Sequence, residues 1–360
     1  MAFEATKKEW SELYAFFRIL SDGYVYLGTP NAKLSDTRQI VAMVQREEHN
    51  GPHQYYIEEK EIRIVSEKET RSFSREDFGT VAGLILNAIK LSPKNETTSP
   101  EGVEEFLDAI GIFNLEAQTN DRTDISIAFW HPQAPLIGFA IHSRMSKMNL
   151  LLDGGRSANL KFELSGIKFA APTVSKINAL DTLNEVPDRM MLIERLGGTL
   201  KYSDVADRVF RSNLSMIDLH FPRLLAEMLR IMQLDDITRV NELTDVIKTV
   251  NPLKIKDELV NKHGFYEYKI KQFLMALALG MRPAKIFNGI DSAVEGMLLI
   301  NGNGEVLCYH KSNKETFENF LFHNTRFEKG ALEKDKYGYL ERENGAYYFK
   351  LNAKIGLTKR

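Results

Sequence analysis

Residues 123–143 (TDISIAFWHPQAPLIGFAIHS) form the segment that most constrains how this chain folds. Two short runs of β-branched and aromatic residues flank a proline-bearing turn, and this pattern predicts a β-hairpin. Side chains alternate between the two faces of a strand, so a shared apolar face leaves Asp124 and His142 together on the opposite side. Two such residues in one cleft are candidates for chemistry, and we place the predicted site at this hairpin.

The composition predicts an ordinary soluble protein of the cytoplasm. Of its 360 residues, 43% are hydrophobic and 27% are charged, which is enough for a sizeable core and, by length, roughly two domains. The formal net charge of −2 weighs against a purely electrostatic nucleic-acid binder, although not against a local basic cleft. Cys308 is the only cysteine, which excludes an intrachain disulfide and fits a reducing compartment. We expect no signal peptide and no membrane span.

A helix is predicted over residues 7–20, where Trp10, Leu13 and Phe17 recur at helical spacing and form an apolar stripe. Glu9 lies on the border of this stripe. Glu12, by contrast, is predicted to point further out toward solvent. Glu9 is therefore the acidic residue of this helix that we expect closer to the packed face.

Further helices are predicted in the middle of the chain, and further strands toward its C-terminus. The helical segments are residues 183–197, 204–232, 238–250 and 254–279. Residues 301–304 read Asn-Gly-Asn-Gly, which predicts a tight hairpin turn. Residues 345–357 alternate in polarity as a half-buried strand does. The architecture is therefore predicted to mix α and β elements.

Five segments along the chain form a distinctive series: KKEWSELYAFFRIL at 7–20, GFAIHS at 138–143 after an aspartate, LLLDGGRSANLKFEL at 150–164, LGMRPAKIF at 279–287 and YYFKLNAKI at 347–355. In this order they resemble the motifs of the HpaII family of type II restriction endonucleases. The likeness runs through nearly the whole chain.

The resemblance implies an α+β fold with a restriction-endonuclease-like nuclease core at residues 1–180, in which helices flank a mixed sheet. Residues 181–360 are then a helical region and a C-terminal α/β part that recognises DNA. The implied activity is Mg²⁺-dependent hydrolysis of double-stranded DNA at a short palindrome, with CCGG as the leading candidate. The implied assembly is a homodimer, with sequential cutting of each strand as the alternative. A cognate DNA methyltransferase is expected in the same system, but not bound to this protein.

The chain departs from the family pattern at one position of the hairpin. Where the family has Ser-Ile-Lys, this chain has Ala140, Ile141 and His142. The lysine of such sites is a point cation that orients the attacking water and steadies the charge on the phosphate. A histidine carries that charge only when it is protonated, which predicts a steeper pH dependence. Lys147 and Arg144 are the alternative sources of this charge, and the choice among the three stays open.

The resemblance also implies a metal site at the hairpin. Mg²⁺ prefers oxygen ligands and keeps several waters, so one or two carboxylates suffice. Asp124 is the predicted main ligand, the backbone carbonyl of Ile141 a second one, and Glu9 a supporting carboxylate. The competing structural interpretations are a solvated strand residue for Asp124, a first-turn glutamate that complements the helix dipole for Glu9, and a satisfied strand histidine for His142.

DNA recognition is predicted for basic and amide side chains. Arginine can bind the O6 and N7 atoms of guanine with two hydrogen bonds, and Arg282 and Arg326 are the predicted base readers. Arg144, Asn159 and Lys350 are further candidates for DNA contacts. Some basic residues of such a surface contact phosphates without reading the sequence, and others are simply solvated.

Two other classes of function compete with the nuclease. The first is a sequence-specific DNA-binding protein on the same scaffold that has lost catalysis through the lysine-to-histidine change at His142. It predicts tight binding to its site without cutting in any metal. The second is an interaction module unrelated to DNA, for which binding to DNA would not weaken log-linearly with salt.

Overall fold

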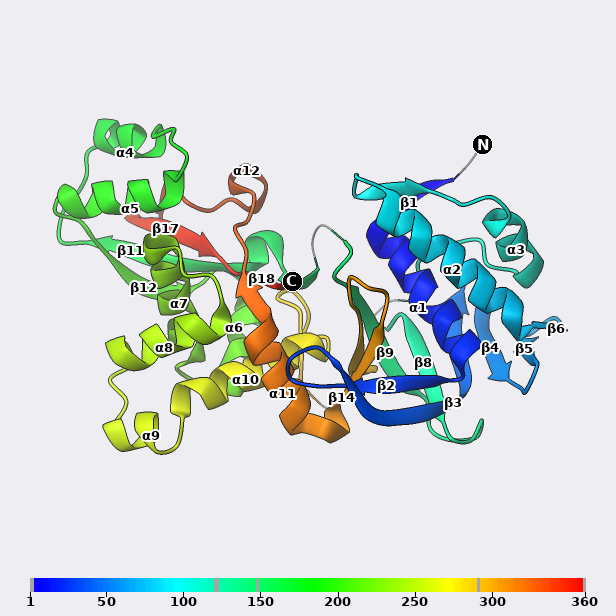
Figure 1. The fold of residues 1–360 in the computed structure, drawn as a ribbon. Coiled ribbons are helices and arrows are strands. Elements are labelled where there is room, and N and C mark those ends of the chain that lie inside the picture. Colours follow the sequence, from blue (N-terminus) through cyan, green and yellow to red (C-terminus); the bar gives the residue numbers. More distant parts are fainter. Residues whose placement is uncertain (1–2, 120–122, 147–148, 290–291, 359–360) are drawn as a thin grey trace.

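The computed structural model describes residues 3–119, 123–146, 149–289 and 292–358. These residues form two lobes that meet along one side (Figure 1). The first lobe is built on a large mixed sheet, and the second combines most of the helices with two smaller sheets. The predicted mixture of α and β elements is confirmed.

The large sheet carries the predicted hairpin near its centre. Its strands are β2 (Tyr24–Gly28), β3 (Leu34–Glu48), β4 (Gly51–Ile57), β5 (Glu61–Val65), β6 (Thr70–Ser74), β8 (Ile125–Phe129), β9 (Ile137–Ser143), β13 (Val294–Ile300) and β14 (Val306–His310). Within the described residues their order is β2-β14-β13-β9-β8-β3-β4-β5-β6. β8 and β9 pair antiparallel, with Ile125 opposite Phe139, so the hairpin forms as predicted. β13 pairs parallel with β9, which brings a strand from late in the sequence next to the hairpin.

Two long helices cover one face of this sheet (Figure 1). They are α1 (Lys7–Asp22) and α2 (Arg75–Leu91), and the lobe is completed by α3 (Val103–Ile110) and the short pair β1 (Glu4–Thr6) and β7 (Glu96–Thr98). α1 begins with a capping box, in which the Thr6 hydroxyl accepts from the Glu9 amide and the Glu9 carboxylate accepts from the Thr6 amide. The helix ends at Gly23, whose φ of 70° suits a residue without a Cβ atom.

The second lobe packs helices around two antiparallel sheets. One sheet contains β12 (Thr199–Val205), β11 (Asn159–Ser165), β17 (Ala346–Asn352) and β16 (Leu340–Glu343), and the other β10 (Leu150–Asp153), β18 (Lys354–Leu357) and β15 (Thr325–Phe327). The helices are α4 (Ala171–Asn178), α5 (Glu185–Arg195), α6 (Arg208–Ile217), α7 (Phe221–Asp235), α8 (Val240–Val250), α9 (Asp257–Asn261), α10 (Phe265–Ala278), α11 (Lys314–Asn324) and α12 (Leu332–Asp335). No helix of the described ranges combines the length and the apolar character that a membrane crossing requires.

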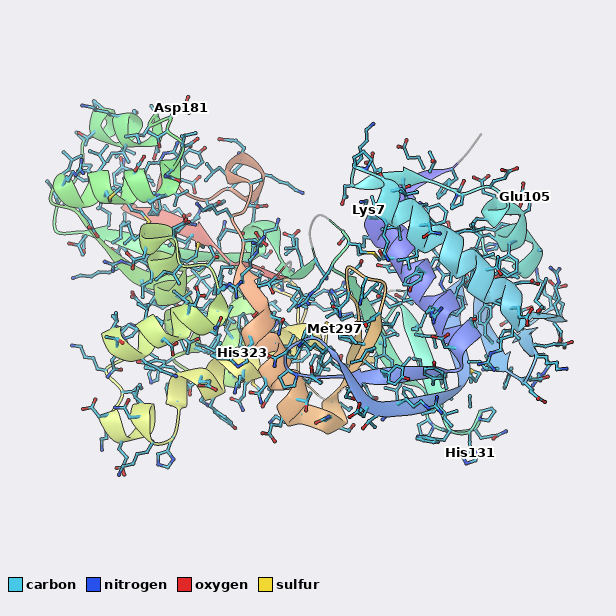
Figure 2. The ribbon with its side chains drawn as sticks, in the orientation of Figure 1. Lys7, Glu105, His131, Asp181, Met297 and His323 are labelled. Atoms are coloured by element: carbon cyan, nitrogen blue, oxygen red, sulfur yellow. The ribbon has the colours of Figure 1, made fainter. Side chains whose placement is uncertain are left out.

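Strand β13 joins the hydrophobic cores of the two lobes. Leu298 and Ile300 belong to the core of the first lobe, whereas Met297 and Leu299 belong to the core of the second. This alternation places one face of the strand in each core, and Met297 lies where the lobes meet in Figure 2. The cores therefore do not follow the predicted division at residue 180. Hydrophobic spacing identifies a buried strand, but not the distant strand with which it pairs.

Candidate active site

A pocket of about 340 Å³ opens beside the hairpin, on the side predicted for chemistry. Asp124, at the start of β8, and His142, on β9, both line it, as the alternation of side chains along the strands predicts. The full lining is Lys8, Glu12, Glu116, Ala117, Thr119, Asp124, Ala140, Ile141, His142, Leu150 and Arg282. The pocket thus collects residues from α1, the hairpin, the segment before it and the second lobe.

Asp124 is held in place by the opposite strand of the hairpin. Its Oδ2 atom accepts a hydrogen bond of 2.6 Å from the Ile141 amide, and its own amide donates to the Phe139 carbonyl at 2.9 Å. Burial raises the pKa of Asp124 to about 6, although the Ile141 amide and Lys8 act in the opposite direction. A fixed carboxylate that keeps a proton more readily than usual thus lies at the centre of the pocket.

Glu12 is the second carboxylate of the pocket, and this corrects the sequence-based prediction. Its side chain is buried instead of facing solvent, whereas Glu9 is engaged in the capping box of α1. Burial, and then the charge of Asp124, raise the pKa of Glu12 to about 8. The prediction was wrong because α1 is buried around nearly its whole circumference from Trp10 to Phe17. A single apolar stripe reports only one packed face.

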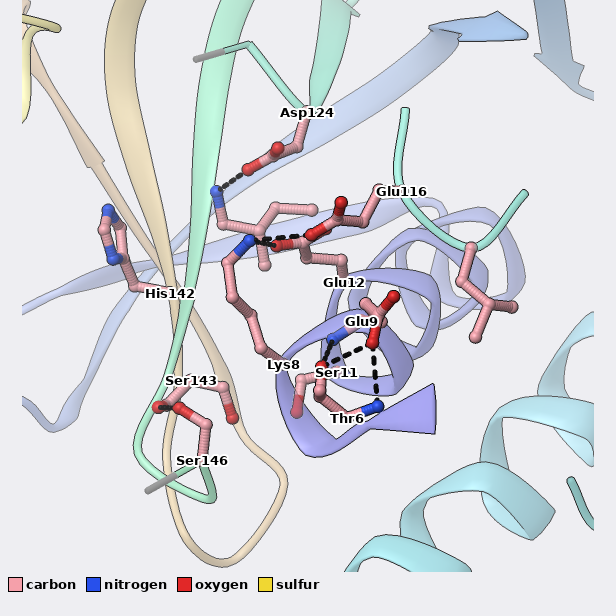
Figure 3. A network of polar contacts seen from close by, with 12 residues as sticks. Thr6, Lys8, Glu9, Ser11, Glu12, Glu116, Asp124, His142, Ser143 and Ser146 are labelled. Carbon is pink, nitrogen blue, oxygen red and sulfur yellow. Dashed lines mark hydrogen bonds and ion pairs between the residues drawn. The ribbon is translucent and has the colours of Figure 1, made fainter. Parts of the chain in front are cut away.

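Lys8 and Glu116 complete the charged group of the pocket. The Lys8 Nζ atom lies 3.0 Å from Glu12 Oε1 and 3.0 Å from Glu116 Oε1, and dashed lines in Figure 3 mark both contacts. Burial lowers the pKa of Lys8, but these two carboxylates outweigh it and hold that pKa above its ordinary range. The ammonium group is therefore charged at neutral pH.

The segment that carries Glu116 is anchored by a buried arginine of the sheet. The Arg46 Nη2 atom donates to the Leu115 carbonyl at 2.5 Å, and the Gln118 amide donates to the Glu47 carbonyl at 2.8 Å. Sequence reasoning missed Lys8 and Glu116 as site residues. The spacing of Lys8 and Glu12 on one helix face was the one available signal, and Glu116 carries no local signal.

The comparisons with known proteins agree with one another. A family model described as HpaII restriction endonuclease matches residues 6–357. The type II restriction enzyme HpaII of Haemophilus parainfluenzae is 30% identical over 360 residues, which cover 98% of each chain. This chain belongs to the HpaII restriction endonuclease family. It is therefore a type II site-specific deoxyribonuclease that acts on double-stranded DNA. No solved structure matches the chain.

In this restriction endonuclease, His142 is the hairpin residue that the motif resemblance predicts to replace the family lysine. Its Nδ1 atom lies 2.5 Å from Asn149 Oδ1. Figure 3 shows its ring across β9 from the ammonium group of Lys8. His142 thus lines the pocket without joining the cluster formed by Lys8, Glu12 and Glu116.

The two other predicted sources of positive charge lie elsewhere. Arg144 follows β9 and donates to Asn324 Oδ1 at 2.8 Å and to Asn301 Oδ1 at 3.3 Å. These contacts direct its guanidinium group toward the β13–β14 turn and the end of α11. Lys147 lies outside the described residues.

The predicted base readers of the endonuclease occupy different surroundings. Arg282, in the segment after α10, lines the pocket beside the hairpin. Arg326, on β15, makes an ion pair of 2.7 Å with Glu328 and is partly exposed. Arg282 is therefore close to the predicted chemistry, and Arg326 is not among the residues that line this pocket.

The other two predicted DNA contacts have partners within the second lobe. Lys350, on β17, makes ion pairs with Glu341 at 2.6 Å and Glu343 at 2.7 Å. Asn159 is buried on β11, where its amide group donates to the Asp335 carbonyl at 2.8 Å. Asn159 thus has buried partners on an interior strand of its sheet, and its contact with DNA stays a prediction.

Type II restriction endonucleases generally use a divalent metal, and the donor set of the pocket fits one. The described residues contain no close group of three His, Cys, Asp or Glu side chains that could hold a metal ion. Mg²⁺ needs only one or two carboxylates, and Asp124 and Glu12 supply them. Burial raises the pKa of both groups because it disfavours their negative charge. A bound cation would neutralise that charge as a proton does.

Proposed function

We propose that this endonuclease hydrolyses double-stranded DNA at a short palindrome, CCGG, with Mg²⁺ as its cofactor. The observation that carries the proposal is the convergence of Asp124 and Glu12, two carboxylates with raised pKa values, in a pocket beside the hairpin. Family membership supports the reaction, and the likeness of the motifs to the HpaII family supports the recognition site.

In this proposal Asp124 and Glu12 bind the metal, with the backbone carbonyl of Ile141 as a further ligand. Bound Mg²⁺ lowers the pKa of a water molecule and polarises the scissile phosphate. The Ile141 amide orients Asp124, and the packing of α1 orients Glu12. Both carboxyl groups release their protons before they can act as ligands, so we expect metal binding to strengthen as the pH rises.

Recognition of the palindrome is proposed for residues of both lobes. Arg282 is close enough to the pocket to contact the DNA near the cleaved bond, and Arg326 is the proposed reader of guanine. Arg144 and Lys350 are proposed as contacts to phosphates. Arg326 and Lys350 already pair with carboxylates. In this proposal, groups of the bound DNA replace those carboxylates as their partners.

The assembly proposed for cutting both strands is a homodimer, since a two-fold axis relates the half-sites of a palindrome. Sequential cutting by a monomer is the alternative. A separate DNA methyltransferase that protects the host sequence completes the proposed system.

A second candidate function is sequence-specific binding without cleavage. The presence of His142 at the position of the family lysine favours it. It differs from the first proposal in a single observable, because it predicts binding to the site in every metal and cutting in none.

The test is incubation of the purified protein with plasmid DNA, with and without Mg²⁺, followed by mapping of the fragment ends. Mg²⁺-dependent fragments that end at CCGG support the proposed reaction and site. Fragments that end at another palindrome overturn the site and retain the reaction. Salt-sensitive binding to CCGG duplexes without cutting in Mg²⁺ or Mn²⁺ overturns the reaction and supports the second function.

A further inference from the structure

The pocket holds a lysine that comes from a helix and not from the hairpin. Lys8 lies in the first turn of α1, one turn before Glu12. Its Nζ atom lies 3.0 Å from the carboxylates of both Glu12 and Glu116, and its charge also acts on Asp124. The ammonium group thus faces the carboxylates to which we assign the metal.

We propose that Lys8 is the catalytic cation of this nuclease. The ammonium group leaves its ion pairs when DNA binds, and it contacts the attacking water and a non-bridging oxygen of the scissile phosphate. In this respect it does what the family pattern assigns to a lysine at the position of His142. The inference rests on the proposed function, because it presupposes Mg²⁺-dependent hydrolysis in this pocket.

The shape and exposure of the Lys8 side chain suit this role. Lysine presents a compact charge with three donors on a flexible four-carbon stem. The Lys8 side chain is 57% exposed, whereas that of Glu12 is only 6% exposed. The ammonium group can therefore move toward a bound phosphate while its carboxylate partner stays in place.

The other cations near the hairpin are less well placed to contact both the carboxylates and the scissile phosphate. His142 lies against Asn149 across β9, and Arg144 donates to Asn301 and Asn324. Within the described chain, Arg282 is the other permanently charged cation that lines this pocket. Its planar guanidinium group is suited to holding a phosphate through two hydrogen bonds. Lys8 remains the side chain that combines a mobile point charge with contact to the carboxylates.

The reaction balances without a change in the protonation of Lys8. The oxygen of the attacking water forms a bond to phosphorus, while the bond between phosphorus and one ester oxygen breaks. The water releases a proton to solvent, and the departing ester oxygen takes up a proton from solvent. Lys8 keeps its own protons and stabilises the negative charge that accumulates on the phosphate.

The experiment compares Lys8→Met with Lys7→Met. Lys7 is the preceding residue of α1, but its Nζ atom donates to the Ser92 carbonyl at 2.8 Å and does not line the pocket; Figure 2 labels it at the start of the helix. We expect Lys8→Met to lower the single-turnover rate of cleavage by about 100-fold or more, as does removal of one donor to a transition-state anion. Lys7→Met should cleave at nearly the wild-type rate.

Two measurements that do not depend on cleavage separate catalysis from structure. Lys8→Met should bind a CCGG duplex in Ca²⁺ as tightly as the wild type does, and Mg²⁺ should still raise its melting temperature without DNA. Cleavage by Lys8→Met within a few-fold of the wild type overturns the inference. So does a loss of duplex binding and of the Mg²⁺ response together with cleavage, because Lys8 would then be structural.

A variant with a polar but uncharged end group covers the case in which Lys8→Met fails to fold. Lys8→Gln retains a donor toward Glu12 but removes the charge, and the same three measurements apply to it. The wild type is assayed in parallel in Mg²⁺. An inactive wild type counts against the proposed function, whereas equal cutting by the wild type and the Lys8 variants counts against Lys8 alone.

Discussion

The pocket beside the hairpin and the second lobe carry their charges in different ways. In the pocket, Lys8 pairs with Glu12 and Glu116, while Asp124 and Arg282 line the same space. Burial raises the pKa of Glu12 and of Asp124. In the second lobe, two of the basic residues proposed to contact DNA have acidic partners: Arg326 pairs with Glu328, and Lys350 pairs with Glu341. The pocket therefore holds buried carboxylates that retain protons, whereas these two cations of the second lobe have acidic partners beside them.

The same contrast appears in the response of single groups to their surroundings. Glu343 binds Lys161 and Lys350, and hydrogen bonds from these lysines lower its pKa. Glu12 has a lysine partner as well, yet its pKa rises to about 8 because burial outweighs the attraction of Lys8. Partly exposed ion pairs of the Glu343 kind contribute little to stability. The buried carboxylates make the pocket a place where an added cation is strongly favoured.

The distribution of charge also bears on how the protein associates with DNA. The net charge of the whole chain is −2, so long-range attraction to the phosphate backbone is weak. In the proposed mode of recognition, Arg326 and Lys350 leave their carboxylate partners when they contact DNA. Recognition and catalysis are thus expected to respond differently to salt and to pH.

The largest expected effect is that of Asp124→Ala. Removal of this carboxylate takes away the main proposed metal ligand, so cleavage should fall by roughly 1,000-fold or more, comparable to the loss of a major electrostatic element of an active site. Binding to a CCGG duplex in Ca²⁺-free buffer should remain near that of the wild type, measured by fluorescence anisotropy. Undiminished cleavage would remove Asp124 from the mechanism.

Glu12→Gln should lower cleavage by about 100-fold, whereas Glu9→Gln should leave it nearly unchanged. Glu9→Gln instead weakens the capping box of α1 and is expected to lower the free energy of unfolding by up to about 1 kcal/mol. Parallel measurements of cleavage and of urea unfolding separate the two carboxylates. A larger catalytic loss in Glu9→Gln than in Glu12→Gln would restore the original prediction for this helix.

The stability of the metal-free protein should depend on pH through Glu12 and Asp124. Both have pKa values raised in the folded state, so their contribution is fully present below their ordinary pKa values and is lost as the pH rises through about 6 and about 8. The larger loss of stability is that of Glu12, and Glu12→Gln has no carboxyl group to deprotonate. This variant should therefore melt at a higher temperature than the wild type near pH 8. Melting temperatures measured from about pH 5 to about pH 8 test this expectation.

Mg²⁺ should raise the melting temperature of the wild type more near pH 8 than near pH 6, because the ion competes with protons for the same carboxylates. Asp124→Ala is the control and should lose most of this pH-dependent gain. A gain that is equal at both pH values would contradict binding by carboxylates with raised pKa values.

The smallest effect is expected at the paired cations of the second lobe. Arg326→Ala should weaken binding to CCGG by about 1–3 kcal/mol and relax the preference for guanine, if Arg326 reads that base. Glu328→Gln frees the same guanidinium group from its partner and should strengthen binding slightly. A uniform loss of affinity for all sequences in Arg326→Ala would instead identify a phosphate contact. Titrations at several salt concentrations distinguish the two outcomes.

Much of the hairpin and of α1 could be predicted because both follow from local patterns. The alternation in residues 123–143 predicts that Asp124 and His142 share one side of the hairpin, and both line the same pocket. The spacing of Trp10, Leu13 and Phe17 correctly predicts a buried helix. Family membership was also readable from short motifs in their order along the chain, and the comparisons confirm it.

The sequence pattern predicted Glu9 as the carboxylate of the pocket, whereas the structure places Glu12 there. This error shows the limit of local patterns. The stripe of apolar residues identifies one packed face of α1, but the hairpin and the segment before it bury a second face that contains Glu12. Likewise, the apolar run of β13 predicts a buried strand without revealing its pairing with β9 across the predicted division at residue 180. Each error arises where two distant parts of the chain meet.

The sequence by itself therefore determined the family, the hairpin and the carboxylate at its centre, because motifs and the alternation of side chains are local properties of the chain. Only the tertiary structure decided which charges surround Asp124. Lys8 and Glu12 approach it from a helix more than a hundred residues earlier, and Arg282 from the second lobe. Their convergence depends on how α1, the sheet and the second lobe pack together, and the geometry of that packing is set by contacts between distant residues.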